Sequence, residues 1–312
     1  MRKFIIKVSL FLFPLIILAF ILEISLRHIP NDYSYKKEYL DKNSDEIETL
    51  ILGSSYAFYG LNPVYFSNKT FNASHISQSL KYDYEIYHKY QPDFKKLKTI
   101  VIPIAYFTMW WKLENENSSW RIKNYVIYYD MTDPESYLHY SEILSNKFKI
   151  NITRFFSYYI QKESNITSSE LGWGIAYNSK HSKDLAKTGE NAALRHTRDN
   201  INSKDNKTVF DENASFLNKI IESDENIKII LFTPPAYKTY YENLEQQQLA
   251  KTIEFATEIS ENHNNCIYYN FLEDTSFIAE DFYDADHLNE IGARKLSLII
   301  NHIIVNDSLC RK

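Results

Sequence analysis

The first strong pattern along the chain is an apolar run near its N-terminus. Residues 8–22 contain no charged side chain, and they follow Arg2, Lys3 and Lys7. As a helix this run is about 22 Å long, which is shorter than the roughly 30 Å hydrocarbon core of a bilayer. If the Lys7 side chain extends to the membrane surface, a helix over residues 4–26 reaches about 34 Å and spans.

This pattern predicts an uncleaved signal anchor over residues 1–28. A cleaved signal peptide and a buried helix remain as alternatives, although residues 19–25 lack the small-x-small cleavage site that a signal peptide needs. The basic N-terminus favours the cytoplasmic side by the positive-inside rule. We therefore expect a single-pass protein whose chain after residue 28 lies outside the cytoplasmic membrane.

Short apolar runs then alternate with segments of helical period. The apolar runs predict buried strands, and they lie at residues 48–53, 70–72, 98–104, 227–233 and 266–271. Helical patterns cover residues 82–90, 214–222, 242–261 and 289–305. Strands that alternate with helices predict a parallel sheet covered on both faces. We expect a three-layer α/β domain over residues 47–306, with about five strands.

Two segments depart from this alternation. Residues 29–46 are polar and predict a stalk or an irregular entry into the domain. Residues 110–206 are polar, aromatic and too long for a simple connection. We expect this second segment to be a mostly helical insertion packed on the α/β core.

Composition narrows the function classes. Among 312 residues, 44% are hydrophobic, so the bulk of the chain is not disordered. The net charge of −5 removes the electrostatic case for nucleic-acid binding. Only 6 glycines occur, and no glycine-rich phosphate loop is present. No His or Cys spacing fits a metal site, so we expect neither a metal nor a cofactor.

Two serines follow the first predicted strand. Gly53 ends that strand, and Ser54 and Ser55 occupy the turn into the next helix. Ligands of open parallel sheets bind at the carboxyl ends of the strands, and the start of a helix favours negative charge on a substrate oxygen. A nucleophilic serine is one interpretation. The alternative is that both serines only cap the helix.

A second candidate stretch follows the last predicted strand and opens the last helix. Asp284 lies three residues before His287. In a tight turn this spacing lets the carboxylate accept the Nδ1–H of the imidazole and leaves Nε2 free for a serine hydroxyl. The alternative is a capping loop closed by Asp286 or Asn289. The presence of both stretches in one α/β domain favours the catalytic interpretation.

Together these stretches resemble the SGNH, or GDSL, hydrolase superfamily. Residues 53–55, Gly-Ser-Ser, match its first block. Residues 284–287 match its D-x-x-H block, and Leu-Asn and Gly-Ala follow at 288–289 and 292–293 as they commonly do in the family. The resemblance covers residues 47–110 and 225–305 and implies a flavodoxin-like strand order.

The resemblance also implies roles for individual residues. Ser55 would be the nucleophile, His287 the base and Asp284 the acid that orients the histidine. The oxyanion hole would consist of the backbone amides of Ser55 and Ser77, with the Gln78 side chain as a further donor. The family's third block contains an Asn donor, whereas residues 103–107 of this chain contain none.

A membrane-anchored domain with these blocks is similar to one branch of the superfamily, which includes the D-alanyl-lipoteichoic-acid biosynthesis protein and the alginate-type O-acetyltransferases. This resemblance implies a bacterial protein that transfers acyl groups to a cell-envelope glycan, beside a multi-spanning membrane-bound O-acyltransferase. A carbohydrate esterase and a catalytically idle scaffold for that acyltransferase remain alternatives.

Three further residues are candidates for substrate binding. Arg195 and His196 lie in the expected insertion, and Tyr237 follows the strand at 227–233. A solvated loop pair and a core or rim aromatic are the respective alternatives. We also expect a disulfide between Cys266 and Cys310, because the last helix should return beside the start of the last strand and the compartment permits oxidation. Two unpaired thiols are the alternative.

Overall fold

The computed structural model describes residues 1–115 and 117–310, with side chains as far as residue 306. Its contacts divide the chain into two compact units. Unit 1 consists of Met1–Lys37 and Glu116–Thr167, and unit 2 consists of Glu38–Asn115 and Ser168–Lys312.

Unit 2 is built on a five-stranded sheet in the order β2-β1-β3-β4-β5. The strands are β1 (Thr49–Ile51), β2 (Thr70–Asn72), β3 (Thr99–Pro103), β4 (Lys228–Thr233) and β5 (Cys266–Asn270). Every neighbouring pair is parallel. This confirms the predicted α/β class and the five-stranded parallel sheet, and the order is flavodoxin-like.

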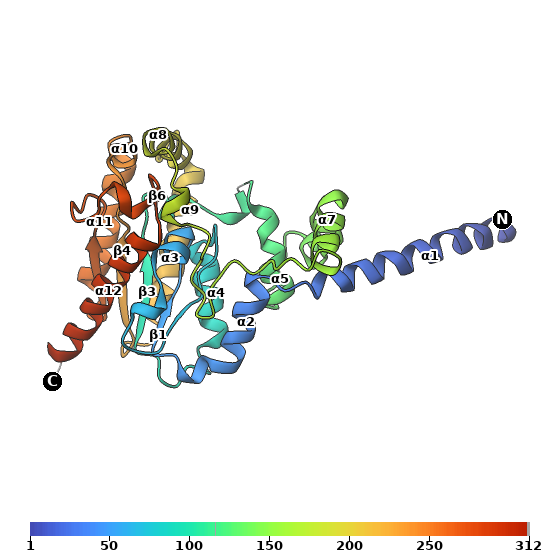
Figure 1. The fold of residues 1–312 in the computed structure, drawn as a ribbon, viewed down its shortest axis with the longest axis horizontal. Helices are drawn as coiled ribbons and strands as arrows, with labels where there is room; N and C mark the ends of the chain where they lie inside the picture. Colours follow the sequence, from blue (N-terminus) through green and yellow to red (C-terminus); the bar gives the residue numbers. More distant parts are fainter. Residues whose placement is uncertain (116, 311–312) are drawn as a thin grey trace. The chain divides into compact units, whose positions relative to one another are not determined.

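Helices of unit 2 connect and cover these strands (Figure 1). They are α3 (Ser55–Gly60), α4 (Leu80–Tyr90), α8 (Leu185–His196), α9 (Lys204–Ile221), α10 (Lys238–Tyr241), α11 (Gln246–Asn262) and α12 (Glu290–Cys310). A short antiparallel pair, β6 (Phe282–Asp284) and β7 (His287–Leu288), lies between β5 and α12. Single turns of 3-10 helix are η1 (Ser44–Glu46), η2 (Pro63–Tyr65), η3 (Thr108–Trp110), η4 (Leu113–Asn115), η7 (Ser179–His181) and η8 (Ala279–Asp281).

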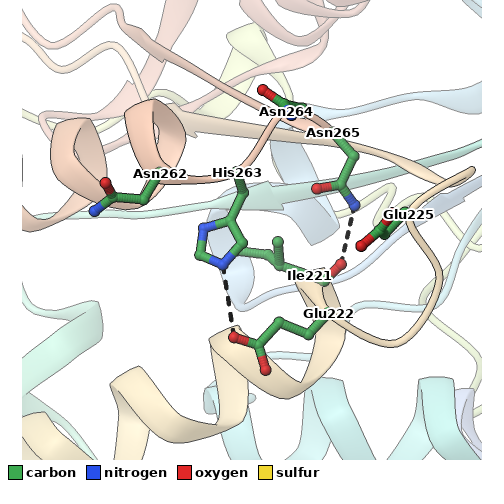
Figure 2. A pocket seen from close by; sticks show the side chains of 7 residues that line it. All are labelled: Ile221, Glu222, Glu225, Asn262, His263, Asn264 and Asn265. Carbon is green, nitrogen blue, oxygen red and sulfur yellow. Dashed lines mark hydrogen bonds and ion pairs between the residues drawn. The ribbon is translucent and has the colours of Figure 1, made fainter.

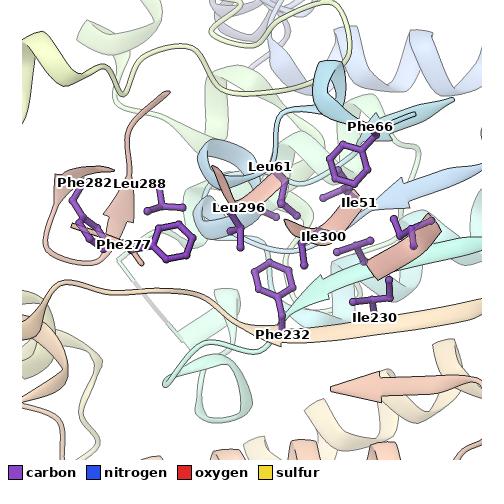
Figure 3. Close-up of a cluster of buried hydrophobic side chains, with 13 residues drawn as sticks. Ile51, Leu61, Phe66, Ile230, Phe232, Phe277, Phe282, Leu288, Leu296 and Ile300 are labelled. Carbon is purple, nitrogen blue, oxygen red and sulfur yellow. The ribbon is translucent and has the colours of Figure 1, made fainter. Parts of the chain in front are cut away.

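One face of the sheet is covered by α3 and α12, which contact each other. Figure 3 shows the buried cluster between them, in which Ile51, Ile230 and Phe232 of the strands meet Leu296 and Ile300 of α12. Side chains of a strand alternate between the two faces. In β1, β2, β3 and β4 the alternate residues are all buried, so both faces of this part of the sheet are covered. The layered arrangement follows from strands that are apolar on both sides.

Leu296→Ala should destabilise unit 2 by about 2–5 kcal/mol, because it removes a fully buried side chain from this cluster and leaves a cavity. Leu298→Ala is a matched control on the same helix, since Leu298 is 45% exposed. We expect the control to change the free energy of unfolding by no more than about 0.5 kcal/mol. Denaturant unfolding of both variants measures the difference, and equal losses would contradict the assigned core.

Unit 1 contains the N-terminal helix α1 (Arg2–Arg27), followed by the start of α2 (Asp32–Asn43). Its second segment forms η5 (Ser119–Arg121), α5 (Ile122–Tyr128), η6 (Tyr137–Tyr140), α6 (Glu142–Ser145) and α7 (Phe148–Tyr159). The apolar part of α1 is long enough to cross a membrane, and none of it is buried in the protein. This agrees with the anchor expected at residues 1–28 and does not determine its orientation.

Two segments differ from the sequence-based expectations. Residues 29–46 are not irregular but contain α2, because the Asn31 side chain accepts the N–H groups of Tyr33 and Ser34 and caps the helix, and Leu40 is fully buried. The segment 110–206 does not group as one body. Its part from Ser168 onward belongs to unit 2, whereas 116–167 groups with α1.

Candidate functional site

The chain turns sharply from β1 into α3 at Gly53. This residue has φ +113°, and a Cβ placed on it would lie 2.5 Å from Cδ of Pro103. Glycine is therefore required both by the backbone conformation and by the close approach. Ser54 then stands at the N-cap of α3 without a capping hydrogen bond from its side chain, and Ser55 is the first residue of the helix.

The structure brings the three residues of the expected triad together. The Ser55 hydroxyl Oγ lies 2.9 Å from Nε2 of His287. Nδ1 of the same ring lies 2.9 Å from Oδ1 of Asp284. Asp284 ends β6 and His287 begins β7, so a tight antiparallel pair sets the spacing between them. Serine, histidine and aspartate thus form a continuous chain of hydrogen bonds. In such a chain the base can activate the hydroxyl nucleophile and the acid orients the base.

The loop that carries Asp284 and His287 is held on both sides by backbone contacts. Between them lies Ala285, whose N–H donates to Oγ1 of Thr188 on α8. The carbonyl of Ala285 accepts the N–H of Tyr237, just before α10. Segments from two distant parts of the sequence thus hold this loop in place.

Aromatic rings enclose the imidazole of His287. The Tyr56 ring stacks on it with centroids 4.9 Å apart, and Tyr177 meets it edge-on at 5.5 Å. Tyr177 is itself stacked between Tyr59, at 3.6 Å, and Tyr283, at 3.9 Å. These rings exclude water from one side of the histidine and restrict its rotation. Their positions show no local pattern in the sequence from which they could have been predicted.

A second carboxylate lies beside the triad. Asp286 is buried, and its Oδ2 lies 3.5 Å from Nδ1 of His287. The same oxygen accepts the hydroxyl of Tyr56 at 3.0 Å and lies 3.9 Å from a guanidinium nitrogen of Arg195. From the sequence, Asp286 was expected only as a residue that closes a capping loop. The signal that could have revealed it is its position directly before the histidine.

These carboxylates determine the charge of the histidine. Burial disfavours the imidazolium of His287, but Asp286 and Asp284 outweigh burial and raise its pKa to about 10. Burial would raise the pKa of Asp286, yet the charge and hydrogen bond of His287 hold it well below its usual range. The two carboxylates therefore favour the imidazolium form, and Nε2 of His287 shares a 2.9 Å hydrogen bond with the Ser55 hydroxyl.

The expected oxyanion residues occupy neighbouring loops. Ser77 follows β2 and has φ +61°, a left-handed backbone conformation that favours glycine. Among the described residues, the backbone N–H groups of Ser55 and Ser77 have no hydrogen-bond partner. The Gln78 side chain instead donates to Asp83 at 2.6 Å, and the same carboxylate oxygen accepts the N–H of Gly53. Gln78 thus supports the turn beneath Ser55, and the oxyanion hole remains a prediction.

The candidate substrate-binding residues lie near the site in different environments. The Arg195 side chain is 61% exposed at the end of α8. His196 packs against the Phe107 ring and bonds to the hydroxyl of Tyr240 at 2.9 Å, and burial lowers its pKa to about 3. Tyr237 is partly buried against the hydrophobic core. Arg195 therefore has the most accessible side chain of the three, and their role in binding remains a prediction.

The sequence also predicts a disulfide between Cys266 and Cys310. Cys266 begins β5 with a buried free thiol, and burial raises its pKa to about 12. The side chain of Cys310 lies outside the described residues, so the disulfide stays a prediction.

No metal was expected from the sequence, yet three residues of the site lie close enough together to hold a metal ion. Asp284, Asp286 and His287 present possible ligand atoms within 4.8 Å of one another. Both nitrogens of the His287 ring already face Ser55 and Asp284 at hydrogen-bond distance.

A pocket of about 380 Å³ lies away from the triad, near the amino ends of the strands (Figure 2). It is formed at the end of α9 and just before β5, near the amino ends of the strands, where ligands of parallel sheets do not usually bind. Its polar groups serve the fold. Asn265 donates to the carbonyl of Ile221 at 2.9 Å, and His263 faces Glu222 at 3.6 Å. We assign it no catalytic role.

No protein-family model matches this chain, and no curated protein is significantly similar to it.

Proposed function

We propose that the protein transfers acyl groups through a serine nucleophile, with a cell-envelope glycan as acceptor. The observation that carries this proposal is the continuous hydrogen-bonded order of Ser55, His287 and Asp284, at 2.9 Å for each contact. Its position at the carboxyl end of β1 supports the proposal, because substrates of parallel sheets bind at that edge.

In the proposed reaction, neutral His287 accepts the hydroxyl proton as Ser55 attacks an ester or thioester carbonyl. The N–H groups of Ser55 and Ser77 would stabilise the oxyanion. His287 then protonates the leaving alcohol or thiol as the carbon–oxygen or carbon–sulfur bond breaks. An incoming glycan hydroxyl gives its proton to His287 and attacks the acyl carbon, and His287 returns that proton to Oγ of Ser55 as the bond between this oxygen and the acyl group breaks.

The proposed setting is the outer surface of a bacterial cytoplasmic membrane. Helix α1 is apolar enough to anchor the protein there, and a multi-spanning acyltransferase is the proposed source of acyl groups. An esterase would use the same acyl-enzyme and resolve it with water, whereas an idle scaffold would form no acyl-enzyme.

Rapid mixing with an activated aryl acetate tests the proposal. We expect a burst of one phenolate per protein, followed by slow turnover that an added envelope glycan accelerates with formation of acetylated glycan. A burst without acceleration by glycans supports the esterase instead. The absence of a burst at pH 7–10 would contradict serine acyl transfer altogether.

The rate of acylation should rise with pH, because the base is the neutral form of His287 and its pKa is raised to about 10. Asp286→Asn removes a negative charge that stabilises the imidazolium, so its midpoint should move to lower pH. Glu280→Gln, an exposed change just before β6, is the control and should leave the midpoint unchanged. A pH profile of the burst rate measures both, and an unchanged midpoint in Asp286→Asn would contradict the electrostatic role.

A further inference from the structure

Unit 1 exposes a group of large apolar side chains on α6, on α7 and just after α7. We call this group the apolar patch, and its members are Leu144, Phe148, Ile150, Phe156 and Ile160. Each is 47–69% exposed. Phe156 and Ile160 are four positions apart and share one face of the helix, and apolar side chains exposed on one face indicate an interaction surface.

The helices that carry the apolar patch are attached to the last turns of α1. The two carboxylate oxygens of Glu23 accept the N–H groups of Glu142 and Ile143, each at 3.0 Å. The hydroxyl of Tyr159, at the end of α7, donates to the carbonyl of Ser25 at 3.0 Å. Figure 1 likewise shows α7 beside the C-terminal part of α1.

These contacts determine the depth of the patch relative to a membrane. The uncharged run of α1 ends at Leu22, and the first acidic residue after it, Glu23, is the one that holds α6. A spanning helix over residues 4–26 therefore places Glu23 and Ser25 within one turn of the membrane surface. Groups fixed to these two residues lie at the level of the lipid headgroups.

The charges around the patch favour a lipid surface. Lys147 and Lys149 flank Phe148, and Lys162 lies two positions after Ile160 and directly before the acidic Glu163, all at exposed positions. The helix α7 itself contains no acidic residue. Basic residues beside exposed aromatic and aliphatic side chains are typical of helices that lie in the interface of a bilayer with anionic lipids.

We propose that the apolar patch is a second membrane-contacting surface, which inserts into the lipid interface beside the C-terminal end of α1. The occupant is the bilayer itself, since α6 and α7 are attached to the last turns of a helix that would already be embedded. This surface would fix unit 1 against the membrane rather than leave it on a flexible tether. The proposal is independent of the catalytic one.

Spin labelling of the full-length protein in vesicles of phosphatidylcholine and phosphatidylglycerol tests this proposal. Cys310→Ser removes the C-terminal thiol, and the buried thiol of Cys266, with its raised pKa, should react slowly. Labels are then placed singly through Phe156→Cys in the patch, Leu12→Cys in α1 and Glu261→Cys on the surface of unit 2.

Molecular oxygen concentrates in lipid, whereas a nickel complex stays in water. We expect oxygen to raise the spin relaxation rate of the labels at 156 and 12 severalfold more than the water-soluble nickel complex does. The label at 261 should show the reverse. A label at 156 that behaves in the vesicles like the one at 261 would overturn the proposal. This holds even if the label at 156 becomes shielded from the nickel complex in native membranes, because the partner would then be another protein and not the bilayer. An aqueous label at 12 would overturn it as well, because α1 would then not be inserted.

Discussion

Ser55→Ala should lower the rate of acyl transfer by as much as about 10⁶-fold, the scale seen when the nucleophile of a serine triad is removed. The variant keeps the backbone amides and the histidine, yet no atom remains to form the acyl-enzyme. The change removes one hydroxyl at a partly buried position, so the thermal unfolding midpoint should stay close to that of the wild type. Burst and steady-state rates with an aryl acetate measure the effect.

Ser54→Ala is the matched control for this prediction. Ser54 is the neighbouring residue and is buried, but its side chain makes no capping hydrogen bond to α3. We expect it to retain most of the activity. If both alanine variants lost activity equally, or if Ser55→Ala kept its burst, Ser55 would not be the nucleophile.

Asp284→Asn should cost on the order of 10⁴ in rate, by analogy with the orienting acid of the serine-protease triad. The 2.9 Å contact between Asp284 and Nδ1 of His287 holds the proton on that nitrogen. An amide at this position can donate to Nδ1 and stabilise the wrong tautomer, which leaves Nε2 unable to accept the Ser55 proton.

The comparison variant for this prediction is Asp286→Asn. Asp286 lies farther from Nδ1, at 3.5 Å, and its Oδ2 also accepts the Tyr56 hydroxyl. We therefore expect a smaller loss from its removal, together with the shift in pH profile described above. Rates are compared on the alkaline plateau of each variant, where His287 is neutral. A milder loss at 284 than at 286 would reverse the two roles.

Much of the sheet could be predicted from the sequence, because strands buried on both faces must be apolar along their whole length. Residues 98–104 and 227–233 show this pattern and contain β3 and β4. The triad could also be anticipated, since Ser55 directly follows a strand and Asp284 and His287 are close in sequence. Local signals sufficed wherever the determining contacts were local.

The remaining features depend on contacts between distant segments. Tyr177 lies far from His287 in sequence and reaches it only through the stack with Tyr59 and Tyr283. The helix α2 is polar in composition and is defined by the Asn31 cap and the burial of Leu40. Neither feature has a sequence periodicity that could have revealed it.

The most direct test of the central claim is reaction with a fluorophosphonate probe, followed by peptide mapping of the adduct. The probe attacks only an activated serine hydroxyl, so it reports the nucleophile without requiring the natural donor or acceptor. We predict a single adduct on the peptide that contains Ser55, normal labelling of Ser54→Ala and no labelling of Ser55→Ala. Labelling of Ser55→Ala at the wild-type level, or an adduct on another residue, would contradict the claim that Ser55 is the nucleophile.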